Sequence, residues 1–351
     1  MQEVVVAPDR IAPGWLTEAL RAHGHLPRGR VAGVRVVSRS ETPPSIHARL
    51  SVEYSPDAPA TAPTRLFFKA PKPHKLAAGE REQDFYAAVA PAMPRVPLPR
   101  AYAHGHDPAT GASYLLLEDL ADSHRPATSP WPPWPELAAM ADALARLHAA
   151  WWGYPGLAEV AGERPEESFA ASFAGNERRF AELADLLGDR LTPEQRRVFE
   201  RFLAAGPALL LGRAAGQGIG GPLTLLHAEN HGGNVLLPHR PPGEVYLIDW
   251  HQYRAWWGPK DLAVLVARCV PPEQRETGPV RERLLRHYHE RLLGHGVPDY
   301  PWEDCLRDYR LAAIDNLTFL LQIRHDPGRV VPQLEASMQE LAALDCLDLL
   351  A

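Results

Sequence analysis

One short stretch of the chain carries three side chains whose types and spacing suit group-transfer chemistry. Glu229 is followed five residues later by Asn234, and fifteen residues after that by Asp249. Apolar, strand-like segments precede both carboxylates, at 223–226 and 245–248. A carboxylate can accept or orient a proton, and magnesium prefers hard oxygen ligands. This order of a base, an amide and a second carboxylate is typical of phosphoryl transfer from a nucleotide with bound Mg²⁺.

The pattern assigns a role to each of the three residues. Glu229 would accept or orient the proton of an attacking hydroxyl, and Asn234 and Asp249 would hold Mg²⁺. Ordinary turn chemistry is the alternative, because Gly232-Gly233-Asn234 makes a good loop and Asp249 would cap the segment after it. We favour the metal, since both residues follow or end an apolar strand within one compact unit.

A lysine and a glutamate earlier in the chain complete the candidate site. Lys69 closes an apolar strand and would contact the nucleotide phosphates, and Glu82 lies thirteen residues later on the next expected helix. Taken by itself, Lys69 would be interpreted as a solvent-exposed lysine at the end of a strand. Because the chain also contains the 229–249 stretch, we favour a contact between Lys69 and the nucleotide phosphates. Glu80 is the alternative partner for Lys69.

The elements that must position these residues fall into two groups. A helix over 11–23, capped by Asp9, is expected before strands at 31–38, 46–54 and 64–69, a helix at 79–89, and strands near 101 and at 113–117. After a proline-rich loop at 126–135 the pattern is helical, at 134–152, 166–187, 193–211, 259–269, 278–293, 302–324 and a last helix ending near 349. Strands interrupt it only within 223–248.

The stretch from His227 to Asn234, with Ile248-Asp249-Trp250, resembles the catalytic segment of the aminoglycoside phosphotransferase and choline/ecdysteroid kinase-like families, H-G-D-x-x-x-x-N and then I-D-W or I-D-F. The segment 79–86 resembles their R-E-x-x-F-Y helix and selects Glu82, and 258–263 resembles their P-x-x-D-L-A helix start. The resemblance implies a two-lobed α+β fold of the protein-kinase kind. It also implies ATP, with GTP possible, Mg²⁺, and a small-molecule acceptor with a hydroxyl group.

The same resemblance implies supporting roles. His227 would brace the loop, and Asp261 would accept hydrogen bonds from the catalytic segment, although the helix dipole alone would also explain a carboxylate in a first turn. Glu118 and Leu120 would belong to the connector whose backbone receives the adenine edge. The order of lysine, glutamate, connector, loop and metal carboxylate is that of a kinase.

Three departures from the family pattern stand out. Glu229 replaces the aspartate, and its extra methylene moves the carboxylate by about 1.5 Å, where about 1 Å can cost on the order of a hundredfold in rate. Ala228 replaces the glycine, which predicts that no positive φ is needed there. The expected phosphate loop at 39–45 has two prolines and no glycine, so the grip on the phosphates would rest on Ser45, Lys69 and the metal.

The sequence gives few indications of which residues would bind the acceptor substrate. Trp256 and Trp257 would line the binding site of an organic substrate or, as large aromatic side chains more often do, pack in the core. Asp315 and Asn316 interrupt an apolar helix, which indicates a polar pocket or a buried hydrogen bond. Aminoglycosides, macrolides, other hydroxylated natural products, choline-like amines and sugars all remain open, as does a role in antibiotic resistance or in biosynthesis.

The composition of the chain limits which classes of binding partner we expect. The 351 residues carry a formal net charge of −6, which disfavours nucleic acid and anionic membranes. With 45% hydrophobic residues, no apparent leader and three scattered cysteines, we expect a soluble cytoplasmic protein with free thiols, as a monomer or a homodimer. Its length predicts two domains, a nucleotide-binding lobe at 1–118 and a helical lobe with the catalytic loop at 119–351.

Two other interpretations of the residues remain. In the first, a pseudokinase-like protein binds nucleotide or ligand while Glu229 and the glycine-free loop have weakened or removed catalysis. In the second, His227, Glu229, His231 and Asp249 hold a catalytic zinc or iron. The spacing is poor for it, because histidines at i and i+4 share a face only on a helix, and Gly232-Gly233 disfavours a helix.

Overall fold

A computed structural model describes residues 3–93, 96–162, 165–215 and 221–350. The contacts divide the chain into two compact units, 1–125 with 236–252, and 126–235 with 253–351. The segment that carries Asp249 therefore folds with the first unit. The lobe boundary expected after residue 118 stays a prediction. Among the described residues no helix is long and apolar enough to cross a membrane.

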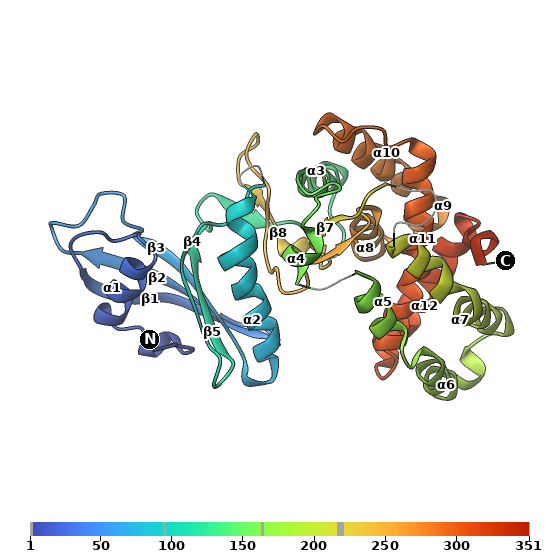
Figure 1. Cartoon of the computed structure of the whole chain (residues 1–351), viewed down its shortest axis with the longest axis horizontal. Coiled ribbons are helices and arrows are strands. Elements are labelled where there is room, and N and C mark those ends of the chain that lie inside the picture. Colours follow the sequence, from blue (N-terminus) through green and yellow to red (C-terminus); the bar gives the residue numbers. More distant parts are fainter. Residues whose placement is uncertain (1–2, 94–95, 163–164, 216–220, 351) are drawn as a thin grey trace. The chain divides into compact units, whose positions relative to one another are not determined.

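The first unit is built on a five-stranded antiparallel sheet in the order β1-β2-β3-β5-β4 (Figure 1). Its elements are α1 (Pro13–Ala22), β1 (Val31–Glu41), β2 (Ser45–Tyr54), β3 (Arg65–Pro71), α2 (Leu76–Asp84), β4 (Ala101–Asp107) and β5 (Ala112–Glu118). Short 3₁₀ turns lie at Pro8–Arg10, Pro73–Lys75 and Ala90–Ala92, and a π turn at Phe85–Val89 continues α2. A small sheet in the order β6-β8-β9 comprises β6 (His124–Pro126), β8 (Val235–Pro238) and β9 (Tyr246–Leu247).

Alternation along the strands fixes which side chains reach the site. Figure 1 shows the large sheet between α1 and α2. Phe68 and Ala70 of β3 are fully buried in an apolar core with Leu16 and Leu20 of α1. Successive side chains of a strand point to opposite faces, so Lys69 points away from this core.

The second unit is mainly helical around a large apolar core. Its helices are α3 (Trp134–Ala150), α4 (Leu157–Ala161), α5 (Pro165–Phe173), α6 (Asn176–Leu187), α7 (Pro193–Ala214), α8 (Pro259–Cys269), α9 (Pro272–Thr277), α10 (Pro279–Gly294), α11 (Trp302–Gln322) and α12 (Pro327–Ala343). Short 3₁₀ turns lie at Gly188–Arg190, Gly232–Asn234 and Cys346–Leu350. Strands β7 (Thr224–Leu226) and β10 (Arg254–Trp256) form an antiparallel pair.

The α+β class expected from the sequence is confirmed, with two local corrections. Asp9 does not cap the first long helix, because it lies in the 3₁₀ turn and the helix N-cap is Ala12. The helix expected over 166–187 is divided into α5 and α6, since Gly175 adopts φ +80°, a left-handed conformation that ends a helix at little cost for glycine.

Candidate active site

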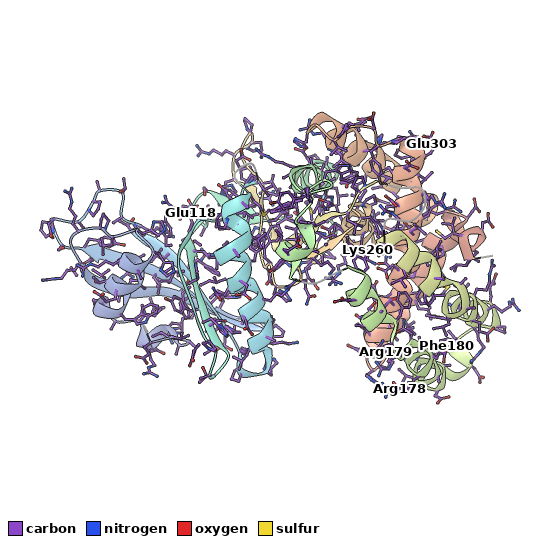
Figure 2. All side chains as sticks on the ribbon, in the orientation of Figure 1. Glu118, Arg178, Arg179, Phe180, Lys260 and Glu303 are labelled. Atoms are coloured by element: carbon purple, nitrogen blue, oxygen red, sulfur yellow. The ribbon has the colours of Figure 1, made fainter. Side chains whose placement is uncertain are left out.

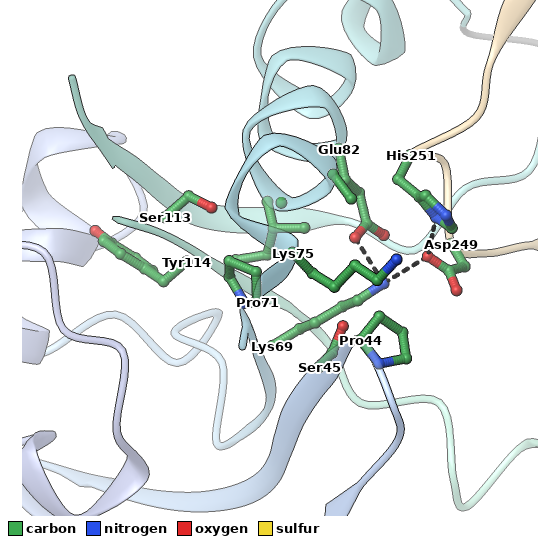
Figure 3. A pocket seen from close by; sticks show the side chains of 13 residues that line it. Pro44, Ser45, Lys69, Pro71, Lys75, Glu82, Ser113, Tyr114, Asp249 and His251 are labelled. Carbon is green, nitrogen blue, oxygen red and sulfur yellow. Dashed lines mark hydrogen bonds and ion pairs between the residues drawn. The ribbon is translucent and has the colours of Figure 1, made fainter. Parts of the chain in front are cut away.

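Lys69 lies at the centre of an ion cluster in the first unit (Figure 3). Its Nζ lies 2.6 Å from Oε2 of Glu82 and 2.8 Å from Oδ1 of Asp249. Burial lowers the pKa of the Lys69 ammonium, but the two carboxylate charges outweigh burial and raise it above its ordinary value. Lys69 therefore stays charged at neutral pH and joins a strand, a helix and the segment after β9.

Glu82 is the glutamate that pairs with Lys69, as predicted. It is buried on α2, where burial raises its pKa and the charge of Lys69 acts against that rise. Glu80, the alternative, is half exposed and lies 3.5 Å from Nε2 of His106. The ring of Phe85, next along the helix, stacks on Trp250 with centroids 4.1 Å apart. This stacking fixes the residue beside Asp249 against the segment that carries Glu82.

Asp249 adopts φ +69°, a left-handed conformation that aspartate tolerates better than most residues. Its Oδ1 accepts hydrogen bonds from Lys69 and from Nδ1 of His251 at 2.8 Å each. Burial would raise the pKa of Asp249, but the charge of Lys69 and the bond from His251 hold it well below its ordinary range. The result is an ionised carboxylate, as a ligand of a hard cation must be.

His251 is a member of the cluster that sequence reasoning missed. Burial lowers the pKa of its imidazole, but the hydrogen bond to Asp249 and the charges of Asp249 and Glu82 together outweigh burial and raise it. Together with Ser45, Lys75 and Ser113 it lines an open pocket of about 350 Å³ around Lys69. The predicted Ser45 is thus placed at the pocket, and its contact with phosphates stays a prediction.

The predicted connector is tied to the large sheet. The Glu118 amide donates to the carbonyl of Arg100 at 2.8 Å, and the Leu120 carbonyl accepts from the amide of His124 at 2.8 Å (Figure 2). Between them, the carboxylate of Asp119 is almost fully buried and pairs with Arg49 and Arg65. These ion pairs hold the connector to β2 and β3. Its contact with adenine stays a prediction.

In the second unit, Asp261 holds the backbone of the loop between β7 and β8. Its Oδ2 accepts the amide of His227 at 2.8 Å, and its Oδ1 accepts the amide of Ala228 at 2.9 Å. Burial would raise the pKa of Asp261, but the hydrogen bond from His148 Nε2 at 3.2 Å, together with that from the His227 amide, holds it below its ordinary value. His148, bonded in turn to Tyr288 at 2.8 Å, escaped the sequence analysis.

The expectation that Ala228 needs no positive φ is wrong. Ala228 adopts φ +68°, a conformation that costs an L-residue about 1–2 kcal/mol. The two hydrogen bonds that Asp261 accepts from consecutive amides impose this bend and offset its cost. The loop therefore keeps the backbone path of a glycine although it carries alanine.

Glu229 has a partner that fixes its longer side chain. Its Oε2 accepts a hydrogen bond from Nη1 of Arg268 at 3.0 Å, and Nε2 of His231 lies 3.9 Å from the same oxygen. Arg268 lies seven residues after Asp261 on α8, two helical turns along the same face. One helix thus holds both the backbone of the loop and the carboxylate of its candidate base.

Asn234 is oriented by the same loop. Its Nδ2 donates to the carbonyl of Glu229 at 3.0 Å, and its own amide donates to the carbonyl of His231 at 2.9 Å. With the amide nitrogen occupied, the carbonyl oxygen is the end of the side chain left for a cation. The donors of Asn234 and Asp249 therefore fit Mg²⁺ chemically. They belong to different units, and their role as joint ligands stays a prediction.

The residues expected on the acceptor side have structural partners. Trp256 and Trp257 are buried in the core of the second unit, which favours the packing interpretation. Asp315 and Asn316 both bind Lys260, with distances of 2.7 and 2.8 Å from its Nζ; Lys260 is labelled in Figure 2. The sequence indicated a polar pocket or a buried hydrogen bond, and Asn316 also lines an open pocket of about 320 Å³. A contact of these residues with an acceptor stays a prediction.

The geometry gives no support to the zinc or iron interpretation. His227 is fully buried, and its Nδ1 accepts the amide of Glu229 at 3.4 Å. Within the described ranges, no group of three or more His, Cys, Asp or Glu side chains is placed to hold a metal ion.

Comparisons with known proteins find a matching family model and similar solved structures. A model of the family described as phosphotransferase enzymes matches residues 58–305. The comparison with curated proteins finds no match. Similar solved structures include an ethanolamine kinase from Plasmodium vivax, with 12% identity, a TM-score of 0.53, and coverage of 88% of this chain and 81% of that one.

Two further structures have the same fold. A GDP complex of aminoglycoside 2′-phosphotransferase-IIIa has 13% identity and a TM-score of 0.52 and covers 95% of this chain and 99% of its own. A macrolide 2′-phosphotransferase from Brachybacterium faecium has 14% identity and a TM-score of 0.51 and covers 92% of this chain and 96% of its own. The likeness confirms the two-lobed protein-kinase-like fold.

Proposed function

The chain belongs to the phosphotransferase enzyme family, and from this premise we propose that it transfers the γ-phosphate of ATP or GTP to a hydroxyl group of a small organic molecule. The observation that carries the proposal is the ion cluster of Lys69 with Glu82 and Asp249 in one pocket. A buried ammonium between two carboxylates at a pocket is the arrangement with which kinases position nucleotide phosphates.

Each residue of the candidate site has its own role in the proposed reaction. Lys69, oriented by Glu82, binds the phosphates. Asn234 and Asp249 are the residues that would hold Mg²⁺, which when bound supplies positive charge against the phosphates. Glu229 orients the acceptor hydroxyl and takes its proton as the hydroxyl oxygen bonds to the γ-phosphorus and the nucleoside diphosphate leaves.

Glu229 suits this role because its carboxylate is held in place. Arg268 fixes one oxygen, and Asp261 fixes the backbone two residues earlier. The longer side chain therefore has a defined position, which a general base requires. This supports a working enzyme over the pseudokinase interpretation.

The similar structures guide the choice of donor and acceptor. They include a GDP complex, an ethanolamine kinase and phosphotransferases of macrolides and aminoglycosides. GTP should accordingly be assayed beside ATP. The acceptor panel should contain aminoglycosides, macrolides, amino alcohols and sugars.

The test is turnover with Mg²⁺ and this panel, for the wild type and for Glu229→Gln and Glu229→Asp. We expect acceptor-dependent release of nucleoside diphosphate and a phosphorylated product, with Glu229→Gln at least about a hundredfold slower. Nucleotide binding without turnover in the wild type, with turnover gained in Glu229→Asp, would establish the pseudokinase interpretation instead. Absence of nucleotide binding would refute both.

A further inference from the structure

The turn between β1 and β2 offers few donors to a phosphate. Pro43 and Pro44 have no amide hydrogen, and the amide of Thr42 donates to the carbonyl of Ser45 at 2.9 Å. The carbonyl of Pro44 accepts the amide of Lys72 at 2.8 Å. The backbone of this turn is thus bonded to itself and to the segment after β3. This turn therefore leaves the phosphates mainly to side chains of the pocket and to the metal.

The charge of Lys69 is already balanced within the cluster. Its ammonium contacts two carboxylates, of Glu82 and Asp249, so these three side chains together carry a net negative charge. A nucleoside triphosphate is itself strongly anionic. Like charges repel, so a cation in addition to Lys69 and the metal would strengthen the binding of phosphates at this pocket.

Lys75 is the nearest candidate for this charge. It lines the same pocket as Lys69 and Asp249. The neighbouring Lys72 forms an ion pair with Glu41 at 2.8 Å. In the described part of the chain, Lys75 has no carboxylate within ion-pair distance, and its charge is available to a ligand.

The start of α2 places Lys75 at the pocket. Lys75 ends the 3₁₀ turn Pro73–Lys75 and is the N-cap residue of α2, and Gly79 and Glu82 of that helix line the same pocket. A Cβ atom at Gly79 would collide with the ring of Pro71, so α2 lies directly against β3 here. The amide of Lys75 donates to the carbonyl of Lys72 at 2.8 Å, which fixes its backbone. Figure 3 shows its side chain extending into the pocket in the same direction as that of Lys69.

We propose that Lys75 is a second phosphate-binding residue, which takes the part that a glycine-rich turn plays in other nucleotide pockets. The inference rests on the proposed function, because it names how the nucleotide is held. Lys75 supplies a side-chain ammonium where the turn between β1 and β2 cannot supply amide hydrogens. It acts on the phosphates and makes no contribution to the binding of the nucleoside.

The test is calorimetric titration of ATP, ADP and adenosine, in Mg²⁺, into the wild type and Lys75→Met. We expect ATP to bind Lys75→Met about tenfold more weakly, with a smaller loss for ADP and none for adenosine. Its ATP affinity should also fall less steeply with salt than that of the wild type, because one phosphate contact is missing. Lys75→Arg should restore most of the ATP affinity.

Lys72→Met is the matched control, since it removes a lysine three residues away that already has a carboxylate partner. We expect its ATP affinity within about twofold of the wild type. Equal ATP affinity in Lys75→Met and the wild type would refute the inference, as would an equal loss for ATP and adenosine. If the wild type binds adenosine and ATP equally weakly, the proposed function itself fails, a pattern distinct from failure at Lys75 alone.

Discussion

The two parts of the candidate site hold their functional groups in different ways. In the first unit, side chains hold side chains, because Lys69, Glu82, Asp249 and His251 are joined by ion pairs and hydrogen bonds of 2.6–2.8 Å. In the second unit, the buried carboxylate of Asp261 holds backbone amides, and the side chain of Glu229 has its own partner in Arg268.

This difference explains which positions tolerate change. Replacing any member of the first cluster alters the charge around the others, since all lie within one pocket. In the loop of the second unit, Asp261 holds the backbone by binding the amides of His227 and Ala228, and neither bond involves the side chain of residue 229. A glutamate can therefore occupy the position of the base without disturbing the loop.

The largest expected effect is at Asp249. Asp249→Asn keeps the shape of the side chain but removes the charge that Lys69 and His251 contact. We expect turnover to fall at least about a thousandfold, because the ion pair and the proposed metal ligand are lost together. Asp142→Asn, which removes an ion-paired carboxylate next to Arg291, is the control and should stay within about twofold. Comparable rates for the two variants would contradict the assignment.

Asp261 should matter for folding as well as for turnover. Asp261→Asn leaves two loop amides and His148 without their charged acceptor, and we expect a loss of about 3 kcal/mol in the free energy of unfolding. The pKa of folded Asp261 lies below that of the unfolded chain. Its stabilisation is therefore complete above about pH 4 and is lost as the pH falls through the folded pKa. Urea unfolding between pH 3 and about pH 7 measures both effects.

Glu82→Gln is the matched variant in the other unit. Burial raises the pKa of Glu82, which means that the folded protein stabilises the ionised form of Glu82 less than that of Asp261. Glu82→Gln should therefore lower the free energy of unfolding by less than Asp261→Asn, while it still lowers turnover. Equal losses of stability in the two variants would remove the distinction between the two parts of the site.

Much of this arrangement could be predicted from the sequence, because local patterns identify residue types at element ends. The apolar strand that ends at Lys69 and the helix after it were expected from local pattern, and the resemblance of 79–86 to the family's helix selected Glu82 as the partner. The helix α8 has the predicted bounds Pro259–Cys269. The positions of Asn234 and Asp249 in their loops also follow from local pattern.

The rest depended on contacts between distant segments. Arg268 meets Glu229 across 39 residues, and His148 meets Asp261 across 113, and no local periodicity specifies such pairs. The prediction for Ala228 failed because a local preference against positive φ was outweighed by two hydrogen bonds that the loop amides donate to a carboxylate on another element. His251 and Lys75 were missed because pocket lining depends on how helix, strand and loop meet.

Arg268 offers a sharper test of how Glu229 works. Arg268→Met should lower kcat about tenfold and leave the KM for the nucleotide unchanged, because the carboxylate of Glu229 loses its orientation while the first unit is untouched. In a Glu229→Asp background the same change should have little effect, since the shorter side chain does not reach Arg268. Arg286→Met, which removes a surface ion pair with Glu282, is the control. Additive losses in the double variant would show that Arg268 acts independently of Glu229.

The smallest expected effect concerns the strained bend at Ala228. Ala228→Gly should raise the free energy of unfolding by up to about 1 kcal/mol, because relief of the positive φ exceeds the extra entropy of glycine in the unfolded chain. Ala139→Gly, within α3, is the matched control and should lower stability by about 1 kcal/mol. The strain is imposed by Asp261, so in Asp261→Asn the bend can relax and the gain at residue 228 should shrink. A gain that persists unchanged there would mean that the bend has another cause.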